Sequence, residues 1–389
     1  LTLIGLEIEE VVDPAKTLTD FRVAEVVSAE KHPDADKLQV LQVNTGKETL
    51  QVVCGAPNAR AGMKGVFAPV GTYVPGIDFI LTKAKIRGVE SSGMMVSERE
   101  LELSDEHTGI IELPAKARLG GSAAKALGLD DVIFDIAITP NRPDCLGVRG
   151  VARDLAAAGL GKLKKDPVKP VKGRFDNPVP VKLSFDKETK SACPIFAGRL
   201  VRGVKNGPSP AWLQARLKAI GLRPINALVD ITNYISFDRA RPLHVYDADK
   251  LNGAVRARLG RIGESFEALD GKTYKVDGEM CVIADDGAVL GLGGVMGGEE
   301  SGCTEETTNV FIESAYFDPK RTARTGRTLN IVSDARFRFE RGIDPQSAEH
   351  GIEQATAMVL DLCGGEASTV TVTGRAPKAN KPFRFDLRL

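Results

Sequence analysis

Histidine, tryptophan and net charge are what this sequence has least of. Its 389 residues include four histidines, one tryptophan, and equal numbers, 52 each, of basic and acidic side chains. A chain without net charge has no general attraction for nucleic acid, so only local basic patches can support such binding. The histidines are scattered and offer no clustered ligands, so we predict no metal site.

Cysteine pairs are also missing. The six cysteines are widely spaced, and none belongs to a C-x-x-C pair. This spacing argues against a disulfide framework and against a zinc knuckle. We expect reduced, mostly buried thiols in a cytoplasmic protein.

Long apolar runs are absent too. No stretch of about 18 apolar residues occurs, so we predict no transmembrane helix and no membrane partner. The apolar start at residues 1–8 lacks a basic segment and a cleavage site, which argues against a signal peptide. The chain lacks an initial methionine and ends on a strand-like segment at 382–389, so we expect a piece cut from a longer protein at both ends.

Alternating apolar and polar residues dominate the first third of the chain. Runs with a period of two, separated by Gly, Asn and Pro, predict short strands. They occupy residues 21–27, 38–43, 50–53, 65–69 and 82–86. This many short strands in one stretch predict a small closed β-barrel.

The pattern becomes mixed α+β further along the chain. Residues 134–138 predict a strand that ends in a turn, and Asp144 is a candidate cap for a helix over 145–158. Residues 209–220 and 347–363 predict helices, each followed by glycine.

Two segments stay ambiguous from their pattern. The lysine- and proline-rich stretch at 161–181 is typical of an extended connector, and a contact with phosphate is the alternative. Residues 229–235 fit either a strand or a helix.

Two sets of motifs resemble known families. HPDADKL at 32–38 resembles the signature of the tRNA-binding OB-fold shared by several aminoacyl-tRNA synthetases and their cofactors. Six further motifs resemble the bacterial-type phenylalanyl-tRNA synthetase β subunit and occur in that family's order: TPNRPDCL (139–146), RPIN (223–226), VDITNY (229–234), RPLHVYD (241–247), GVMGG (294–298) and RFERGIDP (338–345). The resemblance covers nearly the whole chain and suggests an N-terminal fragment of that subunit.

The resemblance implies an α+β multidomain fold in four parts. A small α+β domain at 1–17 and 129–172 is interrupted by an OB-fold β-barrel at 18–128. A mixed α+β editing domain follows at 173–378, and 379–389 begins a further domain.

The resemblance also implies a function and partners. The chain would bind tRNA(Phe) and hydrolyse mischarged Tyr-tRNA(Phe), in support of phenylalanine charging by the whole enzyme. ATP and Mg²⁺ would serve that charging reaction, and this fragment would need no cofactor. The partner would be the α subunit, in an assembly of two α and two β subunits. The alternative is a scaffold that docks tRNA and the α subunit without turnover; a free-standing tRNA-binding or trans-editing protein is a third hypothesis.

Proofreading of this kind makes a definite chemical demand. A mainly apolar pocket rejects an added hydroxyl by only about 10²-fold. A site that hydrogen-bonds the phenol hydroxyl rejects phenylalanine by about 10⁴–10⁵-fold, because its polar group is then left unpaired. An acceptor for the hydroxyl is therefore needed, together with groups that hold the ester, whereas water suffices as nucleophile. No G-x-S-x-G motif indicates a serine hydrolase.

Residues for such a site are assigned by the resemblance. Glu313 would accept the tyrosine hydroxyl, and His244 would position the terminal adenosine or the attacking water. The ester and the amino-acid side would be lined by Arg223, Thr232 and Asn233. The pocket would be shaped by Gly293, Gly297, Ser333 and Ala335, of which Gly293 and Ser333 stand where we expect Ala and Thr in the family.

Each assignment has a plainer alternative. His244 fits a turn-stabilising imidazole, Glu313 fits a strand residue facing solvent, and Arg223 fits a partner for helix C-terminal carbonyls. The glycines at 293–298 do not fit a dinucleotide loop, because the acidic stretch after them opens no apolar-periodic helix. His32, near two aspartates, is more typical of a structured turn than of a metal ligand.

Basic residues predict two RNA contacts. In the barrel they are Lys31, Lys37, Lys83, Lys85 and Arg87, where scarce aromatic residues indicate weak, shape-based binding. In the stretch 320–341 they include Arg324 and Arg327, interleaved with phenylalanines. The alternative for that stretch is that its phenylalanines are core and some arginines pair with Asp334 and Glu340.

Overall fold

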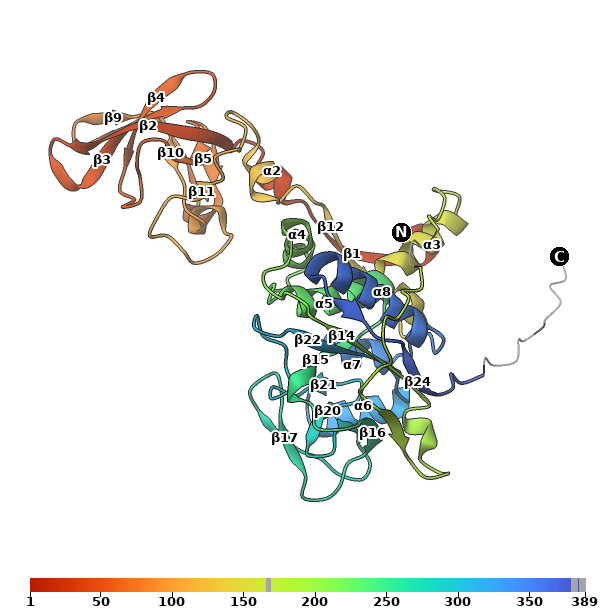
Figure 1. Ribbon diagram of the computed structural model, residues 1–389. Coiled ribbons are helices and arrows are strands. Elements are labelled where there is room, and N and C mark those ends of the chain that lie inside the picture. Colours follow the sequence, from red (N-terminus) through yellow and green to blue (C-terminus); the bar gives the residue numbers. More distant parts are fainter. Residues whose placement is uncertain (166–168, 379–383, 385–389) are drawn as a thin grey trace, which may run out of the picture. The chain divides into compact units, whose positions relative to one another are not determined.

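The computed structural model describes residues 1–165, 169–378 and 384, and the chain divides into two compact units (Figure 1). Unit 1 contains Leu1–Glu7 and Ile136–Leu389, and unit 2 contains Ile8–Asp135. The strand-like end at 382–389 and the further domain predicted at 379–389 lie outside the described residues, except residue 384. Residues 166–168 of the predicted connector lie outside them as well.

A six-stranded antiparallel sheet forms the centre of unit 2. Its strands are β2 (Arg22–His32), β3 (Ala35–Asn44), β4 (Thr49–Cys54), β5 (Lys64–Ala68), β10 (Met94–Met95) and β11 (Glu112–Leu113). They pair in the order β10-β5-β2-β3-β4, with β11 also on β5. Successive residues of β2 face opposite sides, so Val23 packs in one core and Ala24 in another. The predicted strands at 21–27, 38–43, 50–53 and 65–69 correspond to β2 to β5.

The sheet of unit 2 follows an open path with β10 and β4 at its ends. Among the strands that the structure describes, no pairing joins these ends, so the predicted closed barrel is not seen as a continuous ring of hydrogen bonds. The pairing of β2 with β3 is irregular between Val26 and Ser28 and again between Lys31 and His32. Such bulges bend and twist a strand pair. Alternation predicts the strands, but it does not specify how the sheet closes.

Smaller elements complete unit 2. The strands are β1 (Glu7–Val12), β6 (Tyr73–Val74), β7 (Phe79–Ile80), β8 (Ala84–Ile86), β9 (Val89–Ser91) and β12 (Ile133–Ala137), and the helices are α1 (Pro14–Thr17), η2 (Pro75–Ile77), η3 (Arg99–Leu101) and α2 (Ala123–Leu127). β1 pairs with β12 where the chain enters and leaves the unit, β6 pairs with β7, and β8 pairs with β9.

Unit 1 holds two five-stranded sheets. The first contains β14 (Ile195–Arg202), β15 (His244–Asp247), β22 (Asn309–Tyr316), β23 (Glu366–Ala367) and β24 (Thr371–Gly374), in the order β15-β22-β14-β23 with β24 also on β14. The second contains β13 (Val181–Ser184), β16 (Val255–Leu259), β19 (Cys281–Ala284), β20 (Val289–Leu292) and β21 (Met296–Gly297), in that order. A separate hairpin joins β17 (Ser265–Glu267) to β18 (Thr273–Lys275).

The helices of unit 1 are α3 (Val148–Ala157), α4 (Ala211–Ala219), α5 (Ala227–Arg239), α6 (Pro319–Thr328), α7 (Asp334–Phe339) and α8 (Ser347–Cys363), with short turns η1 (Thr2–Ile4), η4 (Pro143–Cys145), η5 (Lys190–Ala192) and η6 (Ala248–Lys250). None of the helices in the described ranges is long and apolar enough to cross a membrane. The helix predicted at 347–363 is α8, and the one predicted at 209–220 is α4. The ambiguous segment 229–235 lies in α5, where the Asn226 side chain accepts a hydrogen bond from the Val229 amide at 3.1 Å and caps the helix.

One predicted cap is wrong. Asp144 lies in η4, and Gly147 is the N-cap residue of α3. The Asp144 carboxylate instead accepts hydrogen bonds from Arg142 and Arg153. The carboxylate pairs with two nearby arginines and caps no helix, because both guanidinium groups donate charge-assisted hydrogen bonds to it directly.

The first sheet of unit 1 lies between helices and the second sheet, as Figure 1 shows. Val310 and Ile312 of β22 pack in the core that α5 and α8 share. Phe311 and Ala315, on the other face of the same strand, pack in the core shared with β16 and β19. This alternation places Glu313 on the inner face, between the two sheets.

Candidate functional site

The candidate site lies on β15 and β22, which run antiparallel. His244 pairs directly with Glu313 across these strands, and Tyr246 follows His244 by two residues. Residues two apart on a strand share a face, so His244 and Tyr246 both point to the side of Glu313. The sheet thus brings together the two residues that the sequence singled out.

A small cavity of about 70 Å³ opens over these side chains. Its lining residues are Pro242, Leu243, His244, Tyr246, Ile283, Gly291, Leu292, Gly294, Val295, Met296, Gly297, Glu313, Phe317, Ala335 and Phe339. Apart from Glu313, His244 and Tyr246, every lining side chain is apolar or absent. This is the composition of a pocket that binds an apolar group and orients it through few polar atoms.

Glu313 is a buried carboxyl group with one strong hydrogen bond. Its side chain is 6 % exposed, and the Tyr246 hydroxyl donates to Oε2 at 2.5 Å. Burial raises its pKa to about 7, while the Tyr246 hydrogen bond and the charge of Arg241 act to lower it. The solvent-facing alternative for Glu313 is therefore wrong.

His244 presents a neutral imidazole to the cavity. Burial lowers its pKa to about 4, and Nε2 is buried without a hydrogen-bond partner. Its ring packs edge-to-face on Tyr246, with the ring centroids 4.5 Å apart. An unpartnered ring nitrogen stabilises no turn, and a buried polar atom of this kind is costly unless a ligand or water meets it.

Glycine at position 297 keeps the ring of His244 in place. A Cβ atom there would lie 2.2 Å from Cε1 and 2.6 Å from Nε2 of His244. Ala335 lines the same cavity from α7. Gly293 has a different role, since a Cβ atom there would lie 2.6 Å from the ring of Phe317; it permits core packing and does not itself line the cavity.

Ser333 uses its hydroxyl within the protein. Its Oγ donates to the Val295 carbonyl at 2.5 Å and accepts from the Arg336 amide at 3.1 Å, which caps α7. Ser333 is therefore next to the cavity wall through Val295, but it is not among the lining residues.

Three predicted residues lie away from the cavity. Thr232 is buried in α5 and donates to the Val229 carbonyl at 2.7 Å. Asn233 is half-buried in the same helix, and Arg223 is exposed in the loop before it. The structure does not bring these side chains to Glu313, and their roles toward an ester stay predictions.

Sequence reasoning missed Arg241 as a neighbour of the site. It is 2 % exposed, and its Nη2 donates to Ser314 Oγ at 2.6 Å and to the Ala315 carbonyl at 2.7 Å. Burial lowers its pKa to about 10, so it stays cationic at neutral pH and opposes the raised pKa of Glu313. Tyr246 was missed as well, although its position two residues after His244 was a usable signal.

The basic stretch at 320–341 divides into two groups. Arg336, Arg338 and Arg341 pair with Glu340 or Asp334, as the alternative for this stretch proposed. Of its two phenylalanines, Phe339 is core as that alternative expected, whereas Phe337 is 41 % exposed. Arg324 and Arg327 remain exposed on α6, and Arg324 also pairs with Glu279 at 2.9 Å.

The five basic residues predicted in unit 2 lie on two neighbouring hairpins. Lys31 and Lys37 flank the turn between β2 and β3, and the others follow in or beside β8: Lys83, Lys85 and Arg87. His32 holds the hairpins together, because its Nε2 is 3.1 Å from the Ile86 carbonyl and its Nδ1 accepts from the Asp34 amide at 3.0 Å. This agrees with the structured turn predicted for His32.

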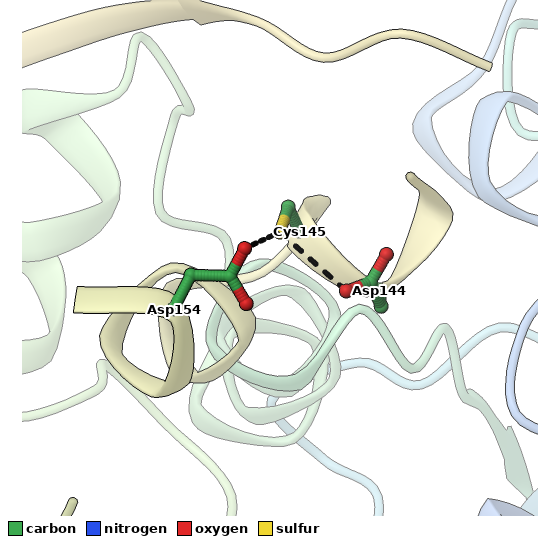
Figure 2. Close-up of side chains that lie close together, drawn as sticks. All are labelled: Asp144, Cys145 and Asp154. Carbon is green, nitrogen blue, oxygen red and sulfur yellow. Dashed lines mark hydrogen bonds between the residues drawn. The ribbon is translucent and has the colours of Figure 1, made fainter. Parts of the chain in front are cut away.

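Figure 2 shows one group of metal-ligand type, Asp144, Cys145 and Asp154, whose ligand atoms lie within 4.8 Å of one another. Arg142 forms ion pairs with both carboxylates, and Arg153 does so too. Burial raises the pKa of the Cys145 thiol to about 11, which keeps it protonated. The group is an arginine–carboxylate network that ties η4 to α3, because two guanidinium groups already neutralise its charge.

Comparison with known proteins gives two family matches. Residues 192–364, which contain the candidate cavity, match the "B3/4 domain" family. Residues 21–122, which contain the basic hairpins, match the "Putative tRNA binding domain" family.

Relatives match along nearly the whole chain. The phenylalanine–tRNA ligase beta subunit of Mesorhizobium japonicum is 59% identical over 389 residues, which is 100% of this chain and 48% of the relative. That of Paramagnetospirillum magneticum is 57% identical over 381 residues, 98% of this chain and 48% of the relative. The chain spans about half the length of these curated relatives. An N-terminal fragment of the Pyrococcus horikoshii phenylalanyl-tRNA synthetase beta subunit aligns with 54% of this chain and 62% of its own at 18% identity, with a TM-score of 0.29 that is too low to support a conclusion.

Proposed function

Because this chain belongs to the phenylalanine–tRNA ligase beta subunit family, we propose that the cavity over His244 and Glu313 hydrolyses tyrosine esters of tRNA(Phe). The observation that carries the proposal is a buried carboxyl group on the wall of a mainly apolar cavity. A ligand that places a hydroxyl against this group gains a hydrogen bond, whereas a ligand without the hydroxyl leaves the buried carboxyl group unpaired.

Glu313 supplies the discrimination in this proposal. The Tyr246 hydroxyl already donates a hydrogen bond to Oε2 of Glu313. Oε1 is then the oxygen that accepts the phenol hydroxyl of the substrate. A tyrosyl group donates to this oxygen, whereas a phenylalanyl group leaves it unpaired. Because the pKa of Glu313 is about 7, the carboxylate form that accepts the hydroxyl gains population as pH rises through neutrality.

His244 positions and does not act as a strong base. With a pKa of about 4 its imidazole is a weak proton acceptor at neutral pH. Its unpartnered Nε2 can hydrogen-bond a water or a ribose hydroxyl at the ester. An aminoacyl ester is reactive enough for an oriented water to complete the attack.

Substrate entry requires a side chain to move. A cavity that takes up benzene measures about 150 Å³, and the cavity here measures about 70 Å³. Met296 lies on the wall and is half-buried, and methionine is the side chain best able to change shape. We assign the entry of the phenol ring to a displacement of Met296.

The rest of the proposal concerns the whole enzyme. Unit 2 is an OB-fold module that binds tRNA(Phe) weakly through its basic hairpins, and the domains run over 1–17 with 129–172, 18–128 and 173–378. The chain works in the cytoplasm beside the α subunit, in an assembly of two α and two β subunits. ATP and Mg²⁺ serve charging by the whole enzyme, not hydrolysis at this cavity.

The test is release of tyrosine from Tyr-tRNA(Phe) by the purified chain. His244→Ala should release tyrosine at a rate close to the uncatalysed one, while His107→Ala, an exposed histidine of unit 2, should match the parent. Equal rates for the parent, His244→Ala and the uncatalysed reaction, with all proteins folded, would favour the scaffold hypothesis, for which the small cavity is the supporting observation.

A further inference from the structure

We propose that Tyr246 is a specificity-determining positioning residue, which fixes the carboxyl group of Glu313 so that one defined oxygen meets the substrate hydroxyl. The inference deepens the proposed hydrolysis of tyrosine esters and rests on it. No role was assigned to Tyr246 from the sequence, although the RPLHVYD motif contains it.

Tyr246 contacts the carboxyl group of Glu313 directly. Both side chains are buried, at 1 % and 6 % exposure, and the Tyr246 hydroxyl donates to Oε2 at 2.5 Å. β15 and β22 set this meeting, because His244 pairs with Glu313 and Tyr246 lies two residues further on the same face. A carboxyl group held at one oxygen has its second oxygen in a fixed direction, and that oxygen is the one left for a ligand.

The ring of Tyr246 has a separate task from its hydroxyl. It packs edge-to-face on His244 with the ring centroids 4.5 Å apart, and it contacts Phe311 in a tilted arrangement with the centroids 6.3 Å apart. Tyr246→Phe keeps both ring contacts and removes only the donor to Glu313. The substitution therefore separates control of the carboxyl group from support of the imidazole.

Charge around Glu313 is simple at neutral pH. The titratable groups that face it are His244, Tyr246, Arg241, Cys193 and Cys281. Burial keeps the phenol and both thiols protonated by raising each pKa, and it keeps His244 neutral by lowering its pKa to about 4. Arg241 stays cationic, so Glu313 is the group of this cluster that titrates near pH 7.

Loss of the Tyr246 hydroxyl should raise the pKa of Glu313. The hydrogen bond from Tyr246 lowers the pKa of Glu313 against the effect of burial. Without it the pKa rises above about 7, so less carboxylate is present at neutral pH and the carboxyl group is free to turn. Hydrolysis of the tyrosine ester should fall, and raising the pH should restore part of it.

The experiment compares the parent with Tyr246→Phe on Tyr-tRNA(Phe) and Phe-tRNA(Phe) between pH 6 and 8.5, after subtraction of the uncatalysed rates. We expect the ratio of tyrosine release to phenylalanine release to fall by about 10-fold at pH 7, the size of one hydrogen bond to a charged group. The pH midpoint of tyrosine release should move upward. Tyr316→Phe, at the last residue of β22, is the matched control and should leave ratio and midpoint unchanged.

A second readout needs no substrate. The infrared carboxyl band of Glu313, identified by its loss in Glu313→Gln, should titrate at a higher pH in Tyr246→Phe than in the parent. An active parent whose ratio and band midpoint are both unmoved by Tyr246→Phe overturns the inference and leaves the proposed function standing. A folded parent that releases no tyrosine overturns the proposed function, and the specificity role of Tyr246 falls with it.

Discussion

Gly297 shows how one missing side chain shapes the site. Its position on β21 faces the His244 ring so closely that a Cβ atom would come within 2.2 Å of Cε1. The resemblance alone assigned this glycine to an open pocket. The structure gives the physical reason, since what a larger residue would displace is the imidazole itself.

Gly297→Ala should reduce tyrosine release by about 100-fold, because a displacement of catalytic groups by about 1 Å has an effect of this size. The ring is rigid and close to its backbone, so it cannot give way as a flexible side-chain end would. Rates on Tyr-tRNA(Phe) measure the effect. Gly278→Ala is the control, since the nearest atom to its Cβ is the Gly260 carbonyl oxygen at 4.0 Å; equal rates in the two variants would contradict the prediction.

Ser333 was predicted to line the substrate pocket, and its hydroxyl instead caps α7 and binds the Val295 carbonyl. Ser333→Ala should lower the free energy of unfolding by about 1 kcal/mol, the usual cost of losing a cap, and should retain most of the hydrolysis. Ser333→Thr should recover the stability. Urea unfolding and hydrolysis rates check this, and a variant with full stability but lost activity would return Ser333 to the substrate side.

At the residue scale, the sequence predicted which residues have chemistry suited to the site better than it predicted which residues contact one another. Glu313 and His244 followed from the resemblance, and the structure places them opposite each other. Arg241 could not be predicted as their neighbour, because its approach depends on Gly351 of α8, where a Cβ atom would lie 3.0 Å from Arg241 Cγ. Contacts between segments so distant in the sequence leave no local pattern.

At the scale of elements, β15 and β22 place two oppositely shifted groups side by side. The folded-state pKa of Glu313 is raised to about 7, so the stability that its protonated form contributes is present below its ordinary pKa and is lost as pH rises through 7. The folded-state pKa of His244 is lowered to about 4, so stability is lost as pH falls from its ordinary pKa toward 4. In the parent these two effects largely cancel.

Single substitutions should uncover each effect. Relative to Glu313→Gln, the parent should lose about 3 kcal/mol of unfolding free energy between pH 4.5 and 7, at about 1.4 kcal/mol per unit of pKa shift. Relative to His244→Gln, it should gain a similar amount between pH 4 and 6.5. Denaturant unfolding at a series of pH values measures both, and slopes of the same sign in the two comparisons would refute the assignment.

Elements with strong local signals were predictable. The period of α8 gave its range of 347–363, and Gly364 ends the helix with a φ of 71°. The segment 229–235 stayed ambiguous because apolar Val229 and Ile231 alternate with polar Asp230 and Thr232, which also fits a strand. It is a helix since α5 is buried between α8 and neighbouring elements. The Asp144 cap failed because arginine pairing, which involves Arg153 nine residues away, is not visible as a capping pattern.

At the scale of the whole molecule, substitutions confined to unit 2 of the intact chain test whether this unit binds RNA. Replacing Lys31, Lys37, Lys85 and Arg87 with Ala should weaken tRNA binding and lower the salt slope by about one for each phosphate that the protein no longer neutralises. Replacing Lys47, Lys116 and Lys125, which are exposed elsewhere in unit 2, should change affinity far less. Filter binding over a range of salt concentrations measures the slopes, and similar decreases in affinity for both variants would mean that the hairpins do not bind the RNA.

The division of the chain into units was only partly accessible from sequence. Two motif families pointed to two modules, and the alternation of unit 2 predicted its strands. Whether the sheet closes depends on bulges and on short strands such as β10, whose two residues carry too little pattern to predict a pairing.

The most direct test of the central claim is the ratio of tyrosine release to phenylalanine release for the parent and Glu313→Ala, measured on tRNA(Phe) charged with each amino acid. If Glu313 accepts the phenol hydroxyl, the parent should strongly prefer the tyrosine ester, and Glu313→Ala should bring the ratio close to one. A folded Glu313→Ala variant that keeps the parent's preference would contradict the account.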